Sequence, residues 1–561
     1  MQENYWTDKY PQGVPAEIDV GQYPNVLAVL KESCERFADK PAFTNLGKTI
    51  TWGEMYRLSG DFAAYLQKHS GLQPGDRIAI QLPNVLQYPV VVFGAMRAGY
   101  VVVNTNPLYT AREMEHQFND SGAKALVCLA NMAHLAEQVV PKTGVKHVIV
   151  TEVGDMLPTF KRLLVNTVVK RVKKMVPAYS IPGAVPFVKA LKEGAGGSFK
   201  EANPSADDTA VLQYTGGTTG RAKGAEITHG NLLANLHQIL PVFNKAGVEE
   251  GREIFLSALP LYHIYALCLN LMVGMGVGAH SILVANPRKI NDYPKLFREH
   301  RISMFPGLGT MFQALARNPD FVRCDHSALK VVLSGGMPLA PEVARQWHEV
   351  TGIEIAEGYG LTETSPVVAL TLSQFRAHPG ADGMLPLPGQ QLRIVHVDDQ
   401  SDLKTGEHGE LWVRGPHVMA GYWQQPEETA QALHDGWLAT GDIGSIDEEG
   451  LLRIHDRMKD LVIVSGFNVY PAEVEDALLK HPQVLEAAVV GLQTAQGKEE
   501  VVAVVVAKDP RPDEQELIEF CREALTRYKV PRRIVFRDEL PKSNVGKVLR
   551  KPLRDELQKS A

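Results

Sequence analysis

Cysteine is scarce in this sequence, and its spacing excludes two classes of site. The 561 residues include five cysteines, an odd number, with no Cys-x-x-Cys pair. A disulfide framework or a structural zinc site is therefore not expected, and a reducing compartment fits the composition. The scattered cysteines are Cys34, Cys128, Cys268, Cys324 and Cys521.

Two further signals are absent. Residues 1–8 are polar and acidic and lack the basic and apolar regions of a secretory signal peptide, so we expect a cytoplasmic protein. The formal net charge is −6 at pH 7, which leaves no bulk positive charge for nucleic acid, and none is expected as a partner. The hydrophobic content of 45% is that of an ordinary globular protein, and the length requires more than one domain.

Long apolar runs are also absent, with the exception of residues 265–285. This run would just span a bilayer, but polar residues interrupt it, and Gly274, Gly276 and Gly278 break its middle. We therefore expect a buried helix followed by a core strand.

A run of small and polar residues stands out at 214–224, with the sequence Tyr-Thr-Gly-Gly-Thr-Thr-Gly-Arg-Ala-Lys-Gly. Glycines let the backbone approach a ligand closely, and hydroxyls, free N–H groups and a lysine bind phosphate oxygens. The Walker A spacing is missing, so the run indicates a different way of holding a nucleotide triphosphate. A flexible surface loop is the alternative.

Strands and helices alternate along much of the chain. Short connections between them indicate an α/β fold with parallel strands covered by helices. The strands are expected at 77–82, 100–104 and 125–128, the helices at 88–97 and 111–121, and similar units around 281–285, 304–305 and 330–334.

A charged connector at 456–460 divides the chain. We predict an N-terminal domain over 1–456, a hinge at 457–460 and a C-terminal domain over 461–561. A plain surface turn is the alternative to a hinge. In the last domain, strands are expected at 461–464, 487–490 and 501–507, and helices at 471–480 and 512–526.

Residues 159–176 form a basic amphipathic pattern. Leu164, Val168, Val172 and the pair Met175 and Val176 fall on one helical stripe, and lysines and arginines cover the other faces. Such a helix can lie on an anionic membrane surface. We favour packing of the stripe on its own domain, because most amphipathic helices are packed in this way.

Four more motifs follow the glycine–threonine run in order. They are Glu357-Gly-Tyr-Gly-Leu-Thr-Glu363, Gly436-Trp-Leu-Ala-Thr-Gly-Asp442, Asp456-Arg457 and Pro541-Lys-Ser-Asn-Val-Gly-Lys547. In this order and at these separations the chain resembles the adenylate-forming superfamily of acyl-CoA synthetases, peptide-synthetase adenylation domains and luciferases. Residues 260–265, 435–459 and 465–471 are similar to bacterial long-chain fatty-acid–CoA ligases. The resemblance covers nearly the whole chain.

The resemblance implies two half-reactions that use ATP, Mg²⁺ and coenzyme A. A fatty-acid carboxylate attacks the α-phosphate of ATP to give an acyl-adenylate and pyrophosphate. The thiol of coenzyme A then attacks the acyl carbon, AMP leaves, and the product feeds fatty-acid degradation. The implied fold is a large N-terminal domain of parallel and mixed sheets covered by helices, with a small β-barrel-like part, and a small mobile α/β C-terminal domain.

The resemblance also implies a nucleotide site. Tyr359 would stack on adenine, Asp442 would accept hydrogen bonds from the ribose hydroxyls, and Arg457 would contact the ribose or phosphate. The remaining residues of the implied ATP and AMP site are Tyr214, Thr215, Gly216, Gly217, Thr218, Thr219, Gly220, Arg221, Ala222, Lys223, Gly224, Ala225, Gly335, Gly336, Gly358, Gly360, Leu361 and Thr362.

Three residues are implied as catalytic. Lys547 would bridge the attacking carboxylate and the α-phosphate and offset their repulsion. Glu363 would bind Mg²⁺ with Thr215 as a partner, since Mg²⁺ favours one or two protein ligands plus phosphates and water. Each of the three could instead be an ordinary surface or core residue, and the motif around it is what favours function.

The remaining implied sites are an acyl tunnel, a coenzyme A channel and a hinge. His263 is expected as a gate or wall residue near the acyl carbonyl, although a core histidine is the alternative. Ser465 and Gly466 would lie by the coenzyme A channel, and Lys459 would mark the hinge. The other expected tunnel residues are Tyr262, Leu267, Gly307, Gly309 and Met337.

The sequence departs from the ligase pattern at three places, which are Arg221, Glu226 and 381–386. Two other functions stay open: an adenylating enzyme that loads a carrier protein, and a nucleotide-binding regulator without catalysis. A homodimer and a peripheral position on the inner face of the cytoplasmic membrane also stay open as expectations.

Overall fold

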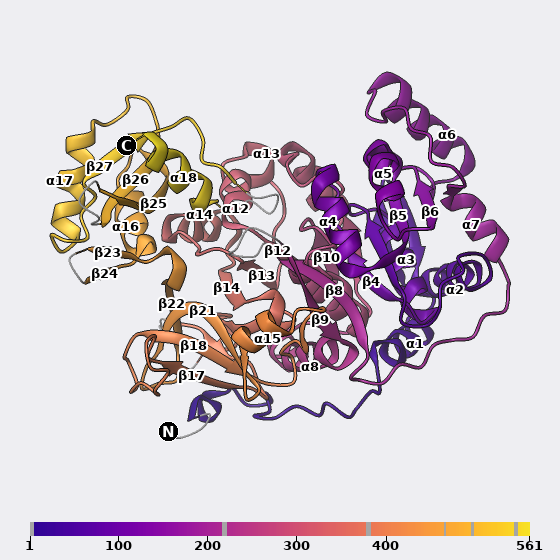
Figure 1. Ribbon diagram of the computed structural model, residues 1–561, viewed down its shortest axis with the longest axis horizontal. Coiled ribbons are helices and arrows are strands. Elements are labelled where there is room, and N and C mark those ends of the chain that lie inside the picture. Colours follow the sequence, from indigo (N-terminus) through magenta and orange to yellow (C-terminus); the bar gives the residue numbers. More distant parts are fainter. Residues whose placement is uncertain are drawn as a thin grey trace.

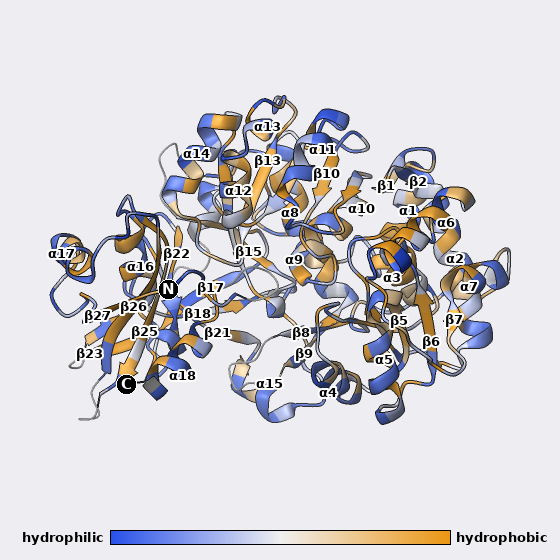
Figure 2. Cartoon of the chain, turned by 90° about the horizontal axis from the view of Figure 1, so that it is seen from above, coloured by the Kyte–Doolittle hydropathy of each residue, from blue (hydrophilic) through white to orange (hydrophobic). Residues whose placement is uncertain are grey.

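The computed structural model describes residues 5–215, 222–376, 383–464, 467–494, 499–542 and 548–560. These residues form a large N-terminal domain and a small C-terminal domain at one end of the molecule (Figure 1). Apolar residues concentrate in the strands and on the helix faces that cover them (Figure 2). The predicted α/β fold class is confirmed.

Two large mixed sheets form the centre of the N-terminal domain. The nine-stranded sheet has the order β16 (Leu385–Pro386), β15 (Val367–Leu370), β14 (Ile355–Gly360), β13 (Val331–Gly335), β12 (Met304–Gly307), β10 (Ile254–Ser257), β11 (His280–Leu283), β1 (Pro41–Asn45) and β2 (Lys48–Thr51). The eight-stranded sheet has the order β19 (Gly421–Tyr422), β9 (Lys223–Thr228), β8 (Thr209–Thr215), β4 (Val101–Asn104), β3 (Arg77–Gln81), β5 (Ala123–Leu129), β6 (His147–Thr151) and β7 (Val185–Pro186).

The central strands β3, β4, β12 and β13 pair in parallel and are almost fully buried, which explains their nearly unbroken apolar sequences. The helices of this domain are α1 (Val26–Arg36), α2 (Trp52–His69), α3 (Gln87–Arg97), α4 (Ala111–Ser121), α5 (Ala133–Val139), α7 (Phe187–Gly194), α8 (His229–Lys245), α11 (Tyr293–Glu299), α12 (Gly309–Ala316), α13 (Pro319–Val322) and α14 (Pro341–Thr351). Three of them, α2, α4 and α8, begin at well-formed caps, because Thr51, Thr110 and Thr228 each accept a hydrogen bond from the third helical N–H.

The apolar run 265–285 is a buried helical segment followed by a strand, as the sequence predicts. It comprises α9 (Ile264–Ala266), the π-helical turn η5 (Leu267–Val273), α10 (Gly274–Gly276) and β11. Gly278 ends the helical part with a φ of 62°, and a Cβ there would lie 2.2 Å from the Phe37 ring, so only glycine fits. Among the described residues, no helix combines the length and the apolar character that crossing a bilayer requires.

The small β-barrel-like part is an antiparallel sheet that the strand–helix alternation alone does not predict. Its five strands are β17 (Gln391–Val395), β18 (Gly409–Arg414), β21 (Trp437–Ile446), β20 (Leu433–His434) and β22 (Leu452–Arg457), with α15 (Pro426–Ala432) beside it. Strand β21 pairs with both β18 and β22, and it therefore carries Asp442 through the middle of this sheet.

The C-terminal domain has two small sheets and three helices within the described residues. The sheets are β23 (Val462–Val464) with β24 (Phe467–Val469), and β25 (Val484–Gln493), β26 (Glu499–Ala507) and β27 (Arg533–Phe536). The helices are α16 (Pro471–Leu479), α17 (Glu514–Ala524) and α18 (Arg550–Ser560). The predicted strands 487–490 and 501–507 are confirmed, although β25 and β26 extend further as a long antiparallel pair.

Ionic contacts hold the C-terminal domain against the end of β22. The Asp456 carboxylate accepts a 2.7 Å hydrogen bond from the backbone N–H of Ala472 at the start of α16. Arg550 of α18 lies 3.6 Å from Asp456, 3.3 Å from Asp460 and 2.7 Å from Glu475. One basic side chain thus joins the connector to two elements of the small domain.

Residues 159–172 are helical, but the predicted packing of the apolar stripe is wrong for Leu164, Val172 and Met175, whereas Val176 packs against the core. They form α6 (Thr159–Thr167), which continues as the π-helical turn η4 (Val168–Val172), and no residue of either is buried. Leu164 is 54% exposed and Val172 is 72% exposed. The stripe faces solvent because polar contacts, described below, fix the opposite face to the domain.

Acid is expected to destabilise the large domain through His417. This side chain is fully buried, and within the described residues its Nε2 atom has no hydrogen-bond partner. Burial lowers the pKa of His417 to about 3, against about 6.5 in an unfolded chain. The lowered pKa means that the unfolded state takes up the proton first, so stability is present above pH 6.5 and is lost as the pH falls towards the folded pKa.

Between pH 7 and pH 5 this histidine alone lowers the free energy of unfolding by about 2 kcal/mol. Urea unfolding of the intact chain and of His417→Gln, measured at both pH values, should give a smaller pH dependence in the variant. An identical pH dependence of the two proteins would contradict this assignment.

Candidate functional site

A buried polar network joins the two large sheets near the carboxyl ends of their strands. The Asn84 amide donates to the backbone carbonyls of Ser257 and Leu259, both at 2.8 Å. The Tyr88 hydroxyl bonds Asn104 and the Leu261 carbonyl, also at 2.8 Å. Because buried polar groups need partners, these bonds fix the segment that leads to Tyr262.

The described ends of the glycine–threonine run lie on two paired strands. Strands β8 and β9 pair in antiparallel fashion, and Thr215 lies opposite Lys223 in the last pair. The strand pair β8–β9, called the hairpin below, therefore holds Thr215 and Lys223 side by side. Predicted nucleotide-site residues Gly216, Gly217, Thr218, Thr219, Gly220 and Arg221 lie outside the described residues.

A cluster of charged and aromatic side chains lies at the base of the hairpin. The Tyr422 hydroxyl donates a 2.8 Å hydrogen bond to the Glu363 carboxylate, and the Lys223 ammonium lies 5.3 Å from the centre of the Tyr422 ring. Lys223 also forms an ion pair with Glu428 of α15. The structure thus brings the predicted metal ligand Glu363 and the predicted phosphate ligand Lys223 together through Tyr422.

Electrostatics support this grouping. Burial raises the pKa of Tyr422, and the neighbouring Glu363 carboxylate raises it further, so the hydroxyl stays a hydrogen-bond donor. The side chain of Lys223 is only 14% exposed, so its ammonium group is partly desolvated. Its ion pair with Glu428 fixes the position of this group.

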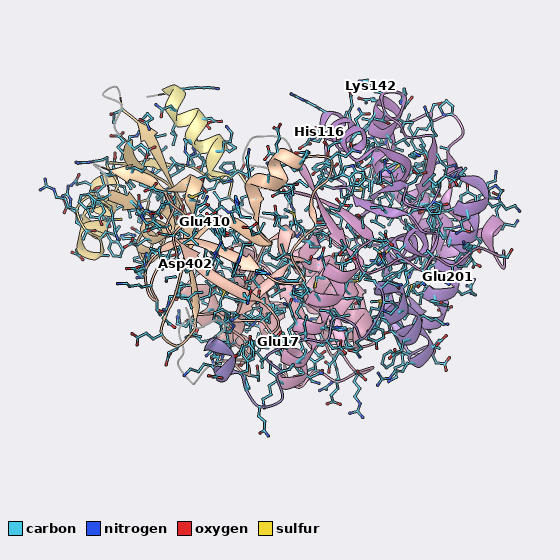
Figure 3. The ribbon with its side chains drawn as sticks, turned by 60° about the horizontal axis from the view of Figure 1, so that its bottom comes forward. Glu17, His116, Lys142, Glu201, Asp402 and Glu410 are labelled. Atoms are coloured by element: carbon cyan, nitrogen blue, oxygen red, sulfur yellow. The ribbon has the colours of Figure 1, made fainter. Side chains whose placement is uncertain are left out.

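The other side of the hairpin contacts α4. The Tyr214 hydroxyl donates a 2.6 Å hydrogen bond to Asp120, and the His116 Nε2 atom lies 3.0 Å from the Ala222 carbonyl. His116 is labelled on this helix in Figure 3. A hollow of about 540 Å³ is lined by Arg112, Glu115, His116, Asn119 and Asp120. The hairpin is therefore anchored on both sides of its tip.

A second cluster forms where β14 meets the small antiparallel sheet. The Tyr359 hydroxyl donates a 2.8 Å hydrogen bond to the Oδ2 atom of Asp442, and the Arg457 Nε atom lies 3.3 Å from Oδ1. Asp442 and Arg457 are register partners on β21 and β22. Burial and the Asp442 carboxylate both raise the pKa of Tyr359 well above its usual value, so this hydroxyl remains protonated.

The local backbone turns Asp442 towards Tyr359. Gly441 has a φ of 70°, which favours glycine, and its N–H donates a 2.9 Å hydrogen bond to Glu410 of β18. The backbone N–H of Asp442 is bonded to the Thr440 hydroxyl at 3.1 Å. Figure 3 labels Glu410 in this part of the molecule.

The glycines around Tyr359 allow close backbone packing. A Cβ on Gly360 would lie 1.9 Å from the Pro366 carbonyl oxygen, and one on Gly335 would lie 3.2 Å from the Tyr265 ring. Gly335 and Gly358 are register partners in the parallel pair β13–β14. Gly336 has a φ of 80°. The predicted nucleotide wall at the ends of these strands thus consists of backbone, which a flat ligand can approach closely.

The predicted acyl-tunnel residues come from three neighbouring parts of the fold. Tyr262 and His263 precede α9, and Leu267 is buried in η5. The Tyr265 hydroxyl donates to the Leu333 carbonyl at 3.2 Å and so ties this segment to β13. The others, Gly307, Gly309 and Met337, follow β12 and β13.

Space beside these glycines is limited. A Cβ added to Gly307 would lie only 2.6 Å from the Phe312 ring. A Cβ on Gly309 would lie 3.4 Å from a Leu339 methyl group. The assignment of these residues to an acyl tunnel stays a prediction.

Several predicted residues at the domain junction lie outside the described residues. These are Lys547 of the catalytic motif and the coenzyme A residues Ser465 and Gly466. Lys459 is described and occupies the short turn Met458–Asp460, directly after Arg457. The domain bounds, the hinge and the mobility of the small domain therefore stay predictions.

Glu226 does not face the tip of the phosphate loop. It lies within β9, and its carboxylate accepts a hydrogen bond from the Thr209 hydroxyl at the opposite end of the hairpin. The third departure, 381–386, is described from Gly383 onward, where Leu385 and Pro386 form the edge strand β16.

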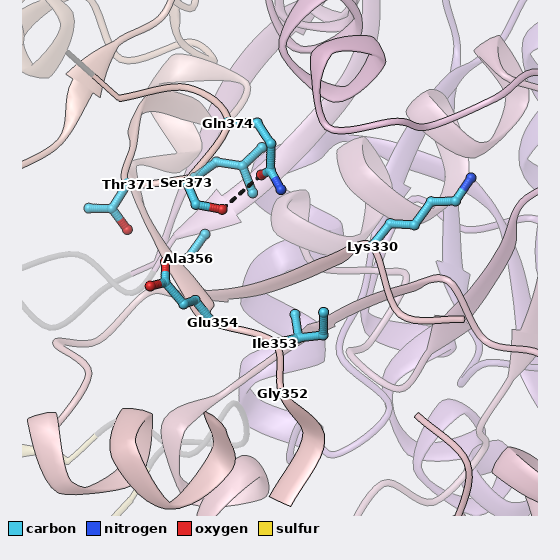
Figure 4. Close-up of a pocket in the computed structure, with 9 residues that line it drawn as sticks. Lys330, Gly352, Ile353, Glu354, Ala356, Thr371, Ser373 and Gln374 are labelled. Carbon is cyan, nitrogen blue, oxygen red and sulfur yellow. Dashed lines mark hydrogen bonds between the residues drawn. The ribbon is translucent and has the colours of Figure 1, made fainter. Parts of the chain in front are cut away.

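Another pocket, of about 190 Å³, lies away from these clusters (Figure 4). Lys330 precedes β13 and Ile353 precedes β14, so the pocket lies at the amino ends of strands whose carboxyl ends carry the predicted nucleotide wall. Its Lys330 is already bonded to the Gly247 carbonyl and to Glu253, both at 2.7 Å. We assign no chemistry to it.

Three site residues were not identified from the sequence: Asp120, Tyr422 and Glu428. Each contacts a predicted residue that is distant in the sequence. Lys223 and Glu428, for example, are 205 positions apart. The antiparallel pairing of β19 with β9 places Tyr422 there, and a two-residue strand carries too little pattern to be recognised.

Comparison with known proteins agrees with this geometry. The AMP-binding enzyme family matches residues 30–423, and its C-terminal domain family matches residues 473–547. The chain is 48% identical to the long-chain-fatty-acid–CoA ligase of Escherichia coli O157:H7, over 98% of both chains. It is also 48% identical to the ligase of the same name from Yersinia pestis, over 99% of this chain and 98% of that one.

Among solved structures, ATP-bound MatB from Rhodopseudomonas palustris superposes with a TM-score of 0.81 at 29% identity. The match covers 95% of this chain and 99% of the other. The two matches lie in both domains and include Lys223, Tyr359, Glu363 and Tyr422, whereas Glu428, Asp442 and Arg457 lie between them. This chain belongs to the AMP-binding enzyme family, whose members form acyl-adenylates from ATP and a carboxylic acid.

Proposed function

We propose that the protein ligates medium- to long-chain fatty acids to coenzyme A through an acyl-adenylate, releasing AMP and pyrophosphate. The two clusters that flank the predicted nucleotide wall carry the proposal. Tyr359, Asp442 and Arg457 form one, and Glu363, Tyr422 and Lys223 form the other. An acceptor-only carboxylate and a cation-lined loop are the groups that a ribose and a triphosphate require.

In the proposed first step, the nucleotide lies across the ends of β13 and β14. Tyr359 is held by Asp442, and this carboxylate also takes the ribose hydroxyls. Lys223 and the hairpin tip bind the β- and γ-phosphates. Lys547, carried in by the C-terminal domain, offsets the repulsion between the acyl carboxylate and the α-phosphate.

The residues present fit a magnesium ion. One Glu363 oxygen is bonded to Tyr422, the other has no hydrogen-bond partner among the described residues, and Thr215 lies at the end of β8. Within the described residues no cluster of three or more potential metal-ligating side chains exists. A set of few protein ligands suits Mg²⁺, which keeps water and phosphate oxygens, and the ion would neutralise triphosphate charge.

For the second step we propose that the C-terminal domain turns about Lys459 and brings Ser465 and Gly466 towards the coenzyme A thiol. The Asp456–Arg550 contact and the hydrogen bond to Ala472 would hold one of the two poses. Exchange between the poses would release these contacts and the ring contacts of Tyr470 with His408 and His455.

The ion pair between Lys223 and Glu428 is expected to compete with ATP. Replacing Glu428 by glutamine removes the competing charge, and we expect the KM for ATP to fall by about twofold to fivefold, because partly exposed ion pairs contribute at most about 1 kcal/mol. Lys223→Ala should raise the KM by about tenfold or more. Pyrophosphate release measured against ATP concentration checks both.

The matched control is Glu448→Gln, an exposed carboxylate in a turn of the small antiparallel sheet, which should leave the KM unchanged. An increase in the KM of Glu428→Gln would mean that Glu428 orients Lys223 for the phosphates and would overturn the competition.

We propose, finally, that the protein is cytoplasmic and works at the inner face of the cytoplasmic membrane, because its proposed substrates partition into lipid. Fatty acids gain about 0.8 kcal/mol for each methylene that leaves water, so long acids are concentrated in bilayers. Contact through residues 159–176 would shorten the path from bilayer to enzyme. Activity with long acids presented in vesicles, compared with the same acids in detergent, tests this placement.

A further inference from the structure

Helix α6 is attached to the protein by its polar side. The Asn166 amide oxygen accepts a 2.8 Å hydrogen bond from the Gly154 N–H, and its nitrogen donates to Asp155 at 3.2 Å. Lys161 donates to the backbone carbonyl of Leu46 in the β1–β2 turn. At the end of η4, Asn131 donates to the Met175 carbonyl at 2.9 Å. These bonds fix which face of the helix points outward.

The outward face is apolar. Phe160 is 82% exposed and Leu163 is 68% exposed, and they lie with Leu164 on one side of α6. Val172 at the end of η4 and Met175 beyond it extend this exposed set, and Leu46 adds to it beside Lys161. A surface helix normally turns this face to the core, so the arrangement is inverted and marks an interaction surface.

The same segment is strongly basic. Residues 156–192 contain no aspartate or glutamate, although the whole chain has a net charge of −6. Their basic residues are Lys161, Arg162, Lys170, Arg171, Lys173, Lys174, Lys189 and Lys192. Among the described residues, none of Lys170, Arg171, Lys173 and Lys174 forms an ion pair, so their charges are available to a partner.

The position of α6 suits a flat partner. Both ribbon views place it at the rim of the molecule, at the end away from the C-terminal domain (Figures 1 and 2). A large surface can therefore meet α6 without touching the predicted hinge or obstructing the small domain.

We infer that α6, η4 and Leu46 form a docking surface for a bilayer that contains anionic phospholipids. Exposed phenylalanine and leucine side chains enter the headgroup–acyl boundary, while lysines and arginines pair with lipid phosphates. A second copy of the chain is a poorer occupant, because an isologous contact would oppose the same basic residues on both copies. The binding of this surface to a bilayer does not depend on the proposed function. Only its purpose, the delivery of fatty acid to the enzyme, rests on the proposed function.

Vesicle flotation of the full chain tests the inference. We expect binding to phosphatidylcholine vesicles with about 30 mol% phosphatidylglycerol, weak binding to pure phosphatidylcholine, and a loss of about tenfold or more when salt is raised from about 50 to about 200 mM. Replacing Lys170, Arg171, Lys173 and Lys174 by glutamine should weaken binding by about 100-fold or more, since each contributes about fivefold.

A matched control neutralises exposed basic residues elsewhere, Lys31, Lys245, Lys289 and Arg301, and should leave binding unchanged. Phe160→Ser with Leu163→Ser should weaken binding by about tenfold or more without changing the salt dependence. Phe160→Trp should be quenched by brominated lipid, and a tryptophan at exposed Val322 should not.

Equal binding by the basic-residue variant and the control, or no quenching at position 160, would overturn the inference. The intact chain could instead self-associate in the absence of vesicles. If the Phe160 and Leu163 changes abolish that self-association, the surface belongs to a contact with a second copy. Acyl-CoA formation from a short water-soluble acid without vesicles separates the two proposals. Activity that persists without vesicle binding removes only the docking surface, whereas vesicle binding without activity removes only the ligase function.

Discussion

Lys547→Ala is expected to lower the rate of acyl-adenylate formation by about 10²- to 10³-fold. The attacking carboxylate and the triphosphate are both anionic, and a positioned cation at the α-phosphate stabilises the charge that develops in the transition state. Single groups of this kind contribute about 3–4 kcal/mol in dry, preorganised sites. The thioester-forming half-reaction, started from synthetic acyl-adenylate and coenzyme A, should keep most of its rate, because the α-phosphate bond is already made.

The control is Lys542→Ala, a lysine of the same motif that instead pairs with Glu486 at 2.6 Å on the surface of the small domain. It should leave both half-reactions within about threefold of the intact chain, since exposed ion pairs contribute little. Equal losses in both half-reactions for Lys547→Ala would assign this lysine to folding or domain placement, and no loss in either would remove it from catalysis.

Asp442→Asn is expected to raise the KM for ATP by about 100-fold. In the folded chain this carboxylate accepts from Tyr359 and faces Arg457, and it is almost fully buried. An asparagine keeps the shape and one acceptor oxygen, but it loses charge and presents an NH₂ group to Arg457 and to the ribose. Charge-assisted hydrogen bonds contribute about 1.5–3 kcal/mol each, so the loss of one or two accounts for the expected change.

Equilibrium binding of ATP by calorimetry, with thermal unfolding of the same samples, separates affinity from stability. Asp402→Asn is the control, because this aspartate lies in the same small sheet region, is half exposed and pairs with Arg393 at 3.7 Å. Unchanged ATP affinity for Asp442→Asn would contradict the proposed ribose contact. A large fall in the unfolding temperature of Asp442→Asn would show that the contact between Asp442 and Tyr359 mainly stabilises the fold.

The parallel core was readable from the sequence because it repeats a strong pattern. The predicted helix 111–121 agrees with α4 to the residue, and predicted strand 77–82 differs from β3 by one position. Both have a distinct period and clear ends: Thr110 caps the helix, and Pro83 follows the strand. The small antiparallel sheet has strands of uneven length in turn-rich sequence, so only the resemblance implied it.

The orientation of α6 shows a different limit. Its sequence pattern correctly predicts an amphipathic helix, but the pattern cannot say which face meets the domain. The structure shows that Asn166 and Lys161 make the anchoring contacts, and these depend on Gly154 and Leu46, which a single helix does not contain. A pattern defines a helix, whereas the partners of each face come from the tertiary fold.

The site was predictable as separate motifs but not as clusters. Glu363, Tyr359, Asp442 and Lys223 stood out because small residues surround them in compact runs. Their partners Tyr422 and Glu428 carry no such context. The pairings of β9 with β19 and of α15 with the hairpin bring them in, and these are contacts between distant parts of the sequence.

The most direct test of the central claim is the stoichiometry of products from the intact chain. ATP, Mg²⁺ and a series of fatty acids of increasing length should yield AMP, pyrophosphate and acyl-CoA in equal amounts, and turnover should require coenzyme A. Sustained pyrophosphate release that coenzyme A does not stimulate would contradict the proposal and indicate an enzyme that loads a carrier protein. No pyrophosphate release with any acid would leave a nucleotide-binding protein without catalysis.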